Sequence, residues 1–263
     1  MATRQAKRKP RVLRSVLESG APVVLAAILL LAWQVAVPLF GISEFVLPTP
    51  WAIVARIWND FALLMQHAYV TGLEVVFGFG IAVLVGVPTG LTIFYSRIFE
   101  KAVYPLLVAL QTIPKVVLAP LLVLYLGYDW APKIFLALLI SFFPIVISTV
   151  VGLQSLEKPM VNLLRSMGAT EMQTFFKLRL PHALPSIFGG FKVAIGLAVI
   201  GAVIGEYVAA ERGLGYLQLQ ASSQFDTTLS FAAVVVISAL GVLLFSAVSA
   251  AESKLVFKHE ESK

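Results

Sequence analysis

Long apolar runs are the feature that most limits how this chain can fold. About six stretches of roughly 20 residues or more carry few charged side chains, at residues 21–40, 68–95, 102–126, 134–153, 189–210 and 229–251. Such a run is long enough for a helix to cross the hydrocarbon core of a bilayer, where every backbone polar group has to be satisfied within the chain. We therefore expect an all-α, polytopic membrane protein with about six transmembrane helices, in which residues 20–251 form one transmembrane domain.

The distribution of charge supports this class and predicts the orientation. Only 13% of the 263 residues are charged and the mean hydropathy is +0.91, whereas about a quarter of the residues in a soluble domain are charged. With the N-terminus inside, most of the 20 Lys and Arg residues fall in inside segments, and only Arg56, Lys133 and Arg212 fall in outside segments. Because cytoplasmic loops are enriched in Lys and Arg, we expect both termini to lie in the cytoplasm.

The two ends are expected to be tails of an inner-membrane protein. Residues 1–19 are basic, with no acidic residue before Glu18, and are expected to be disordered beside anionic lipid. A signal peptide is the alternative, but the apolar run is long for one and no convincing small-residue cleavage site follows it. Residues 252–263 form the second, short cytoplasmic tail.

The predicted outside segments are residues 41–66 and 211–228. The first contains a helix that starts near Pro50. Its apolar face consists of Ile53, Ile57, Trp58, Phe61, Leu64 and Met65. An amphipathic helix of this kind either lies along the membrane surface or packs on the helix bundle, and the sequence leaves both possibilities open.

Small residues recur at helical spacing in two of the apolar runs. Gly86 and Gly90 lie four residues apart in the second run, and the fifth run repeats the pattern at Ala194, Ala198, Ala202 and at Gly201, Gly205. Small residues let the backbones of membrane helices approach closely. We therefore expect the second and fifth runs to pack tightly on other helices.

Residues 155–185 form the longest polar interruption in the second half of the chain. Pro159 suits the first turn of a short helix, which Gly168 can end in a left-handed conformation. Thr170 and Gln173 form a possible capping box for a second helix. Pro181 and Pro185 are expected to close the segment.

Both of these short helices carry an apolar face. The side chains are Met160, Leu163, Leu164 and Met167 on the first helix and Met172, Phe175 and Phe176 on the second. Two short helices with exposed Met and Phe suit docking in a groove on another protein. A packed surface hairpin is the alternative that spacing alone leaves open.

The chain lacks the motifs of an ATPase or a hydrolase. No GxxxxGK[ST], HExxH or GxSxG sequence occurs. Cysteine is absent, and the three histidines, His67, His182 and His259, are too dispersed to suggest a metal site. We therefore expect a chain that is not an enzyme and binds no cofactor. If ATP drives this protein, a separate partner subunit has to hold the ATP and Mg²⁺, which is consistent with a transport subunit. The net charge of +6 reflects topology and does not indicate nucleic-acid binding.

Lys115 and Glu206 are the candidate residues for a translocation path. Lys115 follows Pro114 within an apolar run, and an intramembrane ammonium usually faces the bundle interior or a water-filled path. It could favour an anionic substrate, pair with a carboxylate, or reach to an interface. Glu206, near the outer end of the fifth run, could pair with Lys115, gate the path or lie at the interface. Glu74 is a third candidate for a buried charge.

Residues 155–185 resemble the EAA loop of ABC-importer permeases. In that pattern a Glu-Ala-Ala triplet is followed by a glycine, nine residues and a closing Ile-x-Leu-Pro. Gly168 takes the glycine position, nine residues follow, and residues 178–181 (Leu-Arg-Leu-Pro) match the close. Asn162, Leu163 and Leu164 occupy the Glu-Ala-Ala positions, so the family's acidic residue is absent here.

The resemblance covers residues 45–248 and is to the nitrate, sulfonate and taurine branch of these permeases. The matching pieces are LPTP at residues 47–50, IPKVVLAPLLVLYLG at 113–127 and GEYVAAERGLGYL at 205–217. It implies a type I importer permease fold and a cargo that is a small anion such as a sulfonate, taurine or nitrate. Some similar permeases carry aminopyrimidine-type vitamin precursors instead.

The resemblance also implies the partners and the coupling residues. Two copies of the chain would form the path, two ATPase subunits would bind the cytoplasmic loop, and a periplasmic or lipid-anchored solute-binding protein would deliver the cargo. The residues expected to couple to the ATPase are Asn162, Leu163, Leu164, Met167, Gly168, Phe175, Phe176, Leu180 and Pro181.

Two other functional classes are also open to a polytopic membrane protein. An ion-coupled secondary transporter would tend to show inverted repeats around a midplane ion site, and no clear internal repeat is present. A structural or regulatory membrane subunit without transport activity is the second alternative.

Overall fold

The computed structural model describes the backbone of residues 11–260 and the side chains of residues 21–256. Within the described residues the chain is helical, with no β-strand, which confirms the expected all-α fold. The elements are α1 (Arg11–Leu39), α2 (Pro50–Asn59), α3 (Phe61–Tyr95), α4 (Arg97–Gln111), α5 (Lys115–Leu126), α6 (Trp130–Gln154), α7 (Lys158–Ser166), α8 (Glu171–Thr174), the π-helical turn η1 (Phe175–Arg179), α9 (Leu180–Ala209), α10 (Leu214–Ser223) and α11 (Thr227–Glu260).

Five helical segments are long and apolar enough to cross a membrane. They are Ala21–Leu39, Phe61–Tyr95, Trp130–Gln154, Glu171–Ala209 and Thr227–Val256. A sixth crossing is possible if α4 and α5, which bend by 97° at a short break, count as one span. By length and composition this agrees with the predicted number of about six.

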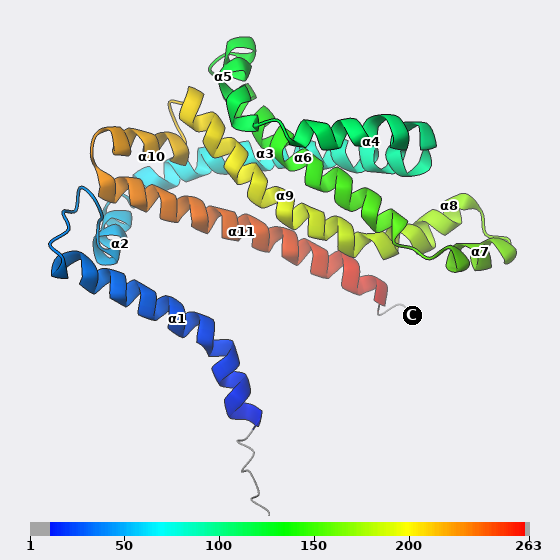
Figure 1. The fold of residues 1–263 in the computed structure, drawn as a ribbon, viewed down its shortest axis with the longest axis horizontal. Coiled ribbons are helices and arrows are strands. Elements are labelled where there is room, and N and C mark those ends of the chain that lie inside the picture. Colours follow the sequence, from blue (N-terminus) through cyan, green and yellow to red (C-terminus); the bar gives the residue numbers. More distant parts are fainter. Residues whose placement is uncertain (1–10, 261–263) are drawn as a thin grey trace, which may run out of the picture.

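The centre of the molecule is a bundle of α3, α6 and α9, with α11 packed along it (Figure 1). Small residues bring these helices together: a Cβ added at Gly201 would lie 2.7 Å from the Cα of Ala137, and one added at Gly90 would lie 2.7 Å from the Cβ of Thr149. Ala194, Ala198 and Ala202 are fully buried. The predicted close packing of the second and fifth runs is therefore confirmed.

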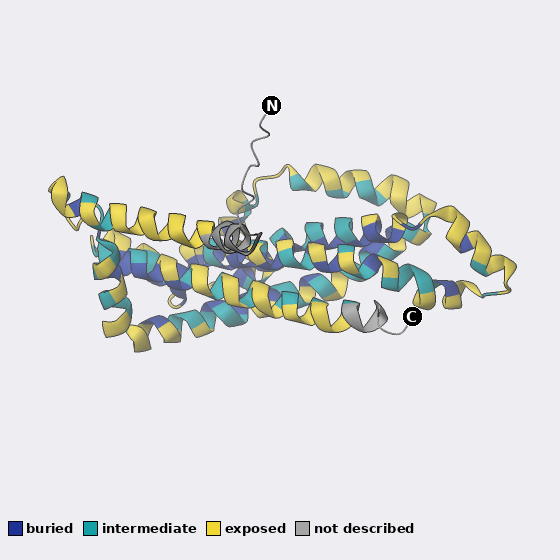
Figure 2. Cartoon of the chain, turned by 90° about the horizontal axis from the view of Figure 1, so that it is seen from below, coloured by how far each residue is buried: buried dark blue, intermediate teal, exposed yellow. Residues whose placement is uncertain are grey.

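Helices α1, α4 and α5 lie at the edge of the bundle. Few residues of the span in α1 are buried, and α4 has no buried residue. Figure 2 shows buried residues in the middle of the bundle and exposed residues along the outlying helices. The two ends of the bundle also differ. Helices α2 and α10 lie at one end, and α7 and α8 lie at the other (Figure 1).

Helix α2 packs on the bundle, although it is shorter than predicted. Thr49 caps it by accepting a hydrogen bond from the Ala52 N–H at 3.2 Å, and Ile53 is buried in a cluster with residues of α10 and α11. The Arg56 guanidinium forms an ion pair with the Asp226 carboxylate, with 2.7 Å between Nη2 and Oδ2. The predicted continuation of the apolar face through Phe61, Leu64 and Met65 is wrong, because a break at Asp60 starts α3 there.

Three further boundaries differ from the prediction. The outside loop at residues 211–228 contains α10, and the turn at residues 96–101 is already helical from Arg97, capped by Ser96. Pro181 and Pro185 do not close the loop segment. Pro181 is the second residue of α9 and directly follows η1, which joins α8 to α9 without a break, so its missing N–H is accommodated within a continuous helical segment.

The predicted tails are only partly described. Residues 1–10 of the expected first tail lie outside the described residues, and residues 11–19 form the first turns of α1. In the second tail, residues 252–260 continue α11, and residues 261–263 lie outside the described residues.

Candidate coupling loop and translocation path

The loop between α6 and α9 has the local geometry that its sequence predicts. Pro159 lies in the first turn of α7, and Gly168 follows that helix with a φ of +81°. The capping box is formed: Thr170 Oγ1 accepts from the Gln173 N–H at 3.2 Å, and the Gln173 side chain accepts from the Thr170 N–H at 2.9 Å. The sequence patterns of this loop therefore predict its turn and its helix caps correctly.

The loop presents an apolar surface at its end of the bundle. The exposed side chains are Met160, Leu163, Met167, Met172 and Phe176. Two of the predicted docking residues lie partly inside instead: Leu164 is half-buried, and Phe175 is half-buried with its ring 6.1 Å from that of Tyr95. Asn162 and Gly168 are exposed, and Leu180 and Pro181 are half-buried at the start of α9.

Lys115 lies at the break between α4 and α5. It is the first residue of α5 and is half-buried. Its Nζ donates to the carbonyl oxygen of Gln111 at 3.2 Å and lies 5.1 Å from the centre of the Phe143 ring. An ammonium near the last carbonyls of a helix is favourable, so Lys115 stabilises the end of α4 as well as placing a cation at the bend.

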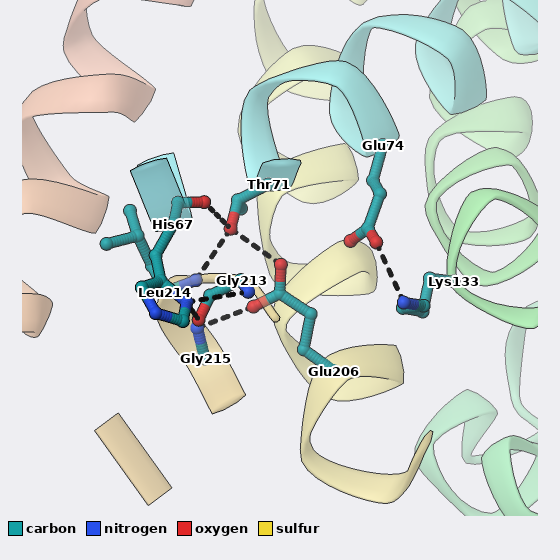
Figure 3. A network of polar contacts seen from close by, with 8 residues as sticks. All are labelled: His67, Thr71, Glu74, Lys133, Glu206, Gly213, Leu214 and Gly215. Carbon is teal, nitrogen blue, oxygen red and sulfur yellow. Dashed lines mark hydrogen bonds and ion pairs between the residues drawn. The ribbon is translucent and has the colours of Figure 1, made fainter. Parts of the chain in front are cut away.

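Glu206 does not pair with Lys115. Its carboxylate, 1% exposed, accepts hydrogen bonds from the Thr71 hydroxyl at 2.6 Å and from the Gly215 N–H at 2.5 Å. Thr71 Oγ1 in turn accepts from the Leu214 N–H at 2.8 Å. The predicted alternative of a Lys115–Glu206 pair is therefore wrong, because Glu206 is occupied at the start of α10 (Figure 3).

Together Glu206 and Thr71 cap α10 from outside that helix. The residue before α10 is Gly213, which has a φ of +118° and no side chain to satisfy the first N–H groups. The first donors of a helix need acceptors from elsewhere, and a carboxylate is also favoured at a helix N-terminus. Helices α3 and α9 thereby hold α10 in place through two buried side chains.

A buried ion pair between Lys133 and Glu74 lies beside this cap. The Lys133 Nζ is 3.1 Å from a Glu74 carboxylate oxygen, and the two side chains are 6% and 0% exposed. Sequence reasoning placed Lys133 in an outside turn and missed the pair. The available signal was one lysine and one glutamate of opposite charge in or beside apolar runs, since intramembrane charges usually pair with one another.

A cavity of about 800 Å³ opens at the same end of the bundle. It is lined by Ala62, Met65, Gln66, His67, Tyr69, Val70, Trp130, Glu211, Arg212 and Tyr216. His67 Nδ1 accepts from the Gly213 N–H at 3.0 Å, and its ring stacks near that of Tyr216. The cap of α10 therefore also fixes one wall of this cavity. In the described part of the chain, no group of three or more His, Cys, Asp or Glu side chains could hold a metal ion.

Comparison with protein families identifies one match. The model of the family described as "Binding-protein-dependent transport system inner membrane component" matches residues 78–256, which include the loop, Lys115, Lys133 and Glu206. A search of solved structures finds the inward-facing MetNI methionine ABC transporter, with a TM-score of 0.64 at 20% identity over 75% of this chain and 98% of the matched chain. That likeness shows the fold.

Several curated proteins are similar over nearly the whole chain. The formylaminopyrimidine transport permease protein ThiX of Halalkalibacterium halodurans is 37% identical over 89% of this chain and 94% of its own. The riboflavin transport system permease protein RibX of Chloroflexus aurantiacus is 37% identical over 90% and 89%. The putative aliphatic sulfonates transport permease protein SsuC of Escherichia coli is 32% identical over 85% and 86%.

Proposed function

The chain belongs to the family of binding-protein-dependent transport system inner-membrane components, and from that premise we propose that two copies of it form the path of an importer for a small anionic solute. As a permease subunit of an ABC importer it is an integral inner-membrane protein that moves a solute. The family assignment removes the basis for the secondary-transporter alternative. ATP hydrolysis then belongs to a partner, which agrees with the absence of a GxxxxGK[ST] sequence in this chain.

The exposed apolar loop carries the proposal that a separate ATPase couples here. Leu163 and Met167 are 62% and 75% exposed. Apolar side chains gathered at one end of a molecule mark a site of protein contact. We therefore assign ATPase coupling to Asn162, Leu163, Leu164, Met167, Gly168, Phe175, Phe176, Leu180 and Pro181, with the half-buried members supporting the exposed ones from below.

This coupling role is tested with the double variant Leu163→Asp/Met167→Asp. Two buried charges at an interface are strongly unfavourable, so the ATPase that co-purifies with the permease should fall at least about tenfold, a change of about 1.4 kcal/mol. Uptake should fall with it. Ser166→Asp is the control, because it adds a charge to the same exposed helix without removing an apolar contact. Full retention of the ATPase by the double variant would refute the assignment.

The solute is proposed to be a sulfonate, taurine, nitrate or a related oxyanion. The half-buried cation of Lys115 at the helix break supports an anion, as do relatives named for aliphatic sulfonates. The second candidate is an aminopyrimidine-type precursor, which is favoured by the greater identity to the formylaminopyrimidine permease. The two candidates differ in charge, and that difference can be tested at Lys115.

Lys115→Gln should separate these two solute classes. A single charge near a partly desolvated path contributes on the order of a few kcal/mol at an effective dielectric constant near 20, so uptake of a labelled alkanesulfonate should fall about tenfold or more at equal membrane abundance. Uptake of formylaminopyrimidine, which carries no negative charge, should be unaffected. Lys101→Gln, on exposed α4, is the matched control. If a sulfonate is imported and the variant imports it normally, Lys115 does not belong to the path.

A further inference from the structure

Helix α5 leaves the bundle and has one uncovered apolar side. It is bent by 97° from α4, and in Figure 1 it points away from the bundle that the long helices form. Ala119 and Val123 are buried on the side where α5 lies close to α6 and α9. The other side is exposed and forms the α5 stripe, which consists of Val117, Leu121, Leu124 and Tyr125. These four positions follow the spacing i, i+4, i+7 and i+8, so they lie on one face of the helix.

The α5 stripe carries no charge. Residues 116–128 include no Asp, Glu, Lys or Arg, so the stripe suits either the interior of a bilayer or another apolar protein surface. Because lipid tails are as apolar as these side chains, the stripe by itself does not distinguish the two. The backbone next to the stripe decides between them.

The break between α4 and α5 lies at the depth of the hydrocarbon core. Lys115 directly follows the break, and its Nζ is 5.1 Å from the centre of the Phe143 ring. Phe143 lies near the middle of the 25-residue helix α6. A helix of that length measures about 37 Å, against a hydrocarbon core of about 30 Å. The break is therefore far from both membrane surfaces.

The backbone at this break is not covered by the chain itself. Thr112, Ile113 and Pro114 are all exposed. Pro114 offers no side-chain acceptor to the first N–H groups of α5, and such groups need partners from outside their own helix. Non-helical backbone at membrane depth is tolerated only where it is buried in protein or lines a water-filled cavity. Lipid is therefore excluded as the neighbour of the break.

We propose that α5 is the helix by which two copies of this chain meet, with their α5 stripes in contact and their two breaks lining a water-filled path between them. This inference rests on the proposed function, in which two copies form the path. A two-fold contact uses the same surface on both copies, which suits a stripe that has no charge to repel its counterpart. Lys115 at each break explains why the path is hydrated there, because two ammonium groups are too costly to bury together without water.

Cross-linking between single cysteines tests the contact, because the chain has no cysteine of its own. Each residue of the α5 stripe is changed to cysteine in turn, and the purified complex is treated with a short bifunctional maleimide. Since all four side chains are exposed, the substitutions leave the packing within one copy unchanged. We expect permease dimers on a denaturing gel from at least two of these variants.

Leu84→Cys on α3 and Leu243→Cys on α11 are the matched controls for this cross-linking. Both are exposed apolar residues well inside long membrane-spanning helices, and both should stay monomeric. Stripe variants that form no more dimer than these controls overturn the proposal. Dimers from a control alone would show that the two copies meet through another helix.

The rate of reaction with a charged methanethiosulfonate tests whether the breaks lie in water. Only an ionised thiol reacts, so in membranes that are open on both sides Ile113→Cys should react about tenfold or more faster than Leu84→Cys. Leu84 is the more exposed of the two side chains in a single copy, so exposure in one copy does not account for that order. Equal rates would show that the break does not line a hydrated path.

The number of permease chains in the unmodified complex separates this inference from the proposed function. Native mass spectrometry of the complex counts them. One permease chain per complex contradicts the proposed function, because a path between two copies then cannot form. Two chains per complex, without cross-links through the α5 stripe, overturn this inference alone.

Discussion

At the scale of single residues, the buried charges stabilise the end of the bundle that carries α10 rather than line one continuous path. Glu206 and Thr71 satisfy the first N–H groups of α10, and Lys133 pairs with Glu74 next to them. Lys115 instead contacts Gln111 and Phe143. We therefore expect the effects of Lys115→Gln and Glu206→Gln on stability to add within about 0.5 kcal/mol, as for sites that share no partner.

Glu206→Gln should loosen α10 while leaving the rest of the bundle intact. The amide keeps only one acceptor oxygen; if that oxygen accepts from the Gly215 N–H, the NH₂ group faces Thr71, whose hydroxyl has to turn its proton to the His67 carbonyl oxygen at 3.2 Å. The variant therefore exchanges short bonds to a carboxylate for weaker neutral ones, at a cost of about 1–2 kcal/mol. Hydrogen exchange of the Leu214–Ser223 backbone should then accelerate about tenfold or more. Glu211→Gln, a neighbouring exposed acid, should show wild-type exchange. Equal exchange in both variants would contradict the capping role.

At the scale of helices, the sequence predicted helix caps and turns that depend on neighbouring residues. It did not predict contacts between residues that lie far apart in the chain. The capping box and the left-handed Gly168 depend on residues within a few positions, which is why their sequence patterns predict them correctly. The pair of Glu74 with Lys133 joins residues far apart in the chain, and the external cap of α10 draws on two other helices. No local pattern contains that information.

The effect of proline on the helices likewise could not be predicted from local sequence. Pro114 coincides with a 97° bend, whereas Pro88, Pro144 and Pro185 lie inside continuous helices. Membrane helices tolerate proline where neighbours or local adjustment satisfy the freed carbonyl groups. Which proline breaks a helix is therefore decided by the packing around it, and the position of a proline in the sequence does not contain that information.

Gly168→Val tests whether the loop needs its left-handed residue. A Cβ at Gly168 would meet no atom within 4 Å, so only the φ of +81° opposes the substitution. A β-branched residue there should cost roughly 1–2 kcal/mol or more and should misplace α8, lowering uptake and ATPase retention. Gly168→Asn, which tolerates this φ better, should be affected less.

The matched control for this substitution is Gly196→Ala. Gly196 also has no atom within 4 Å of an added Cβ, but it lies inside α9 with an ordinary helical backbone. Alanine is favoured over glycine there, so transport should be preserved. Equal uptake by Gly168→Val and Gly196→Ala would show that the conformation of Gly168 does not matter for coupling.

At the scale of the whole molecule, helix length fixes how far the ends reach beyond the membrane. Helix α3 has 35 residues, which corresponds to about 52 Å, against a hydrocarbon core of about 30 Å. Its ends therefore project into the two interfaces. One end carries the cap of α10 and the 800 Å³ cavity, and the other meets the loop of α7 and α8 (Figure 1).

The last prediction concerns orientation, which we propose from the charge bias. Because α7 and α8 lie at the opposite end of the bundle from α10 (Figure 1), one of these regions faces the cytoplasm and the other faces outward. The preference of cytoplasmic segments for Lys and Arg places Gln173 inside, together with both termini.

The chain has no cysteine, so single introduced cysteines report cleanly. An impermeant thiol reagent applied to cells with a permeabilised outer membrane should label Ser222→Cys at once and Gln173→Cys only after the inner membrane is opened. Both positions are exposed, so the reverse pattern would show that the loop faces outward and would remove it from contact with any ATPase.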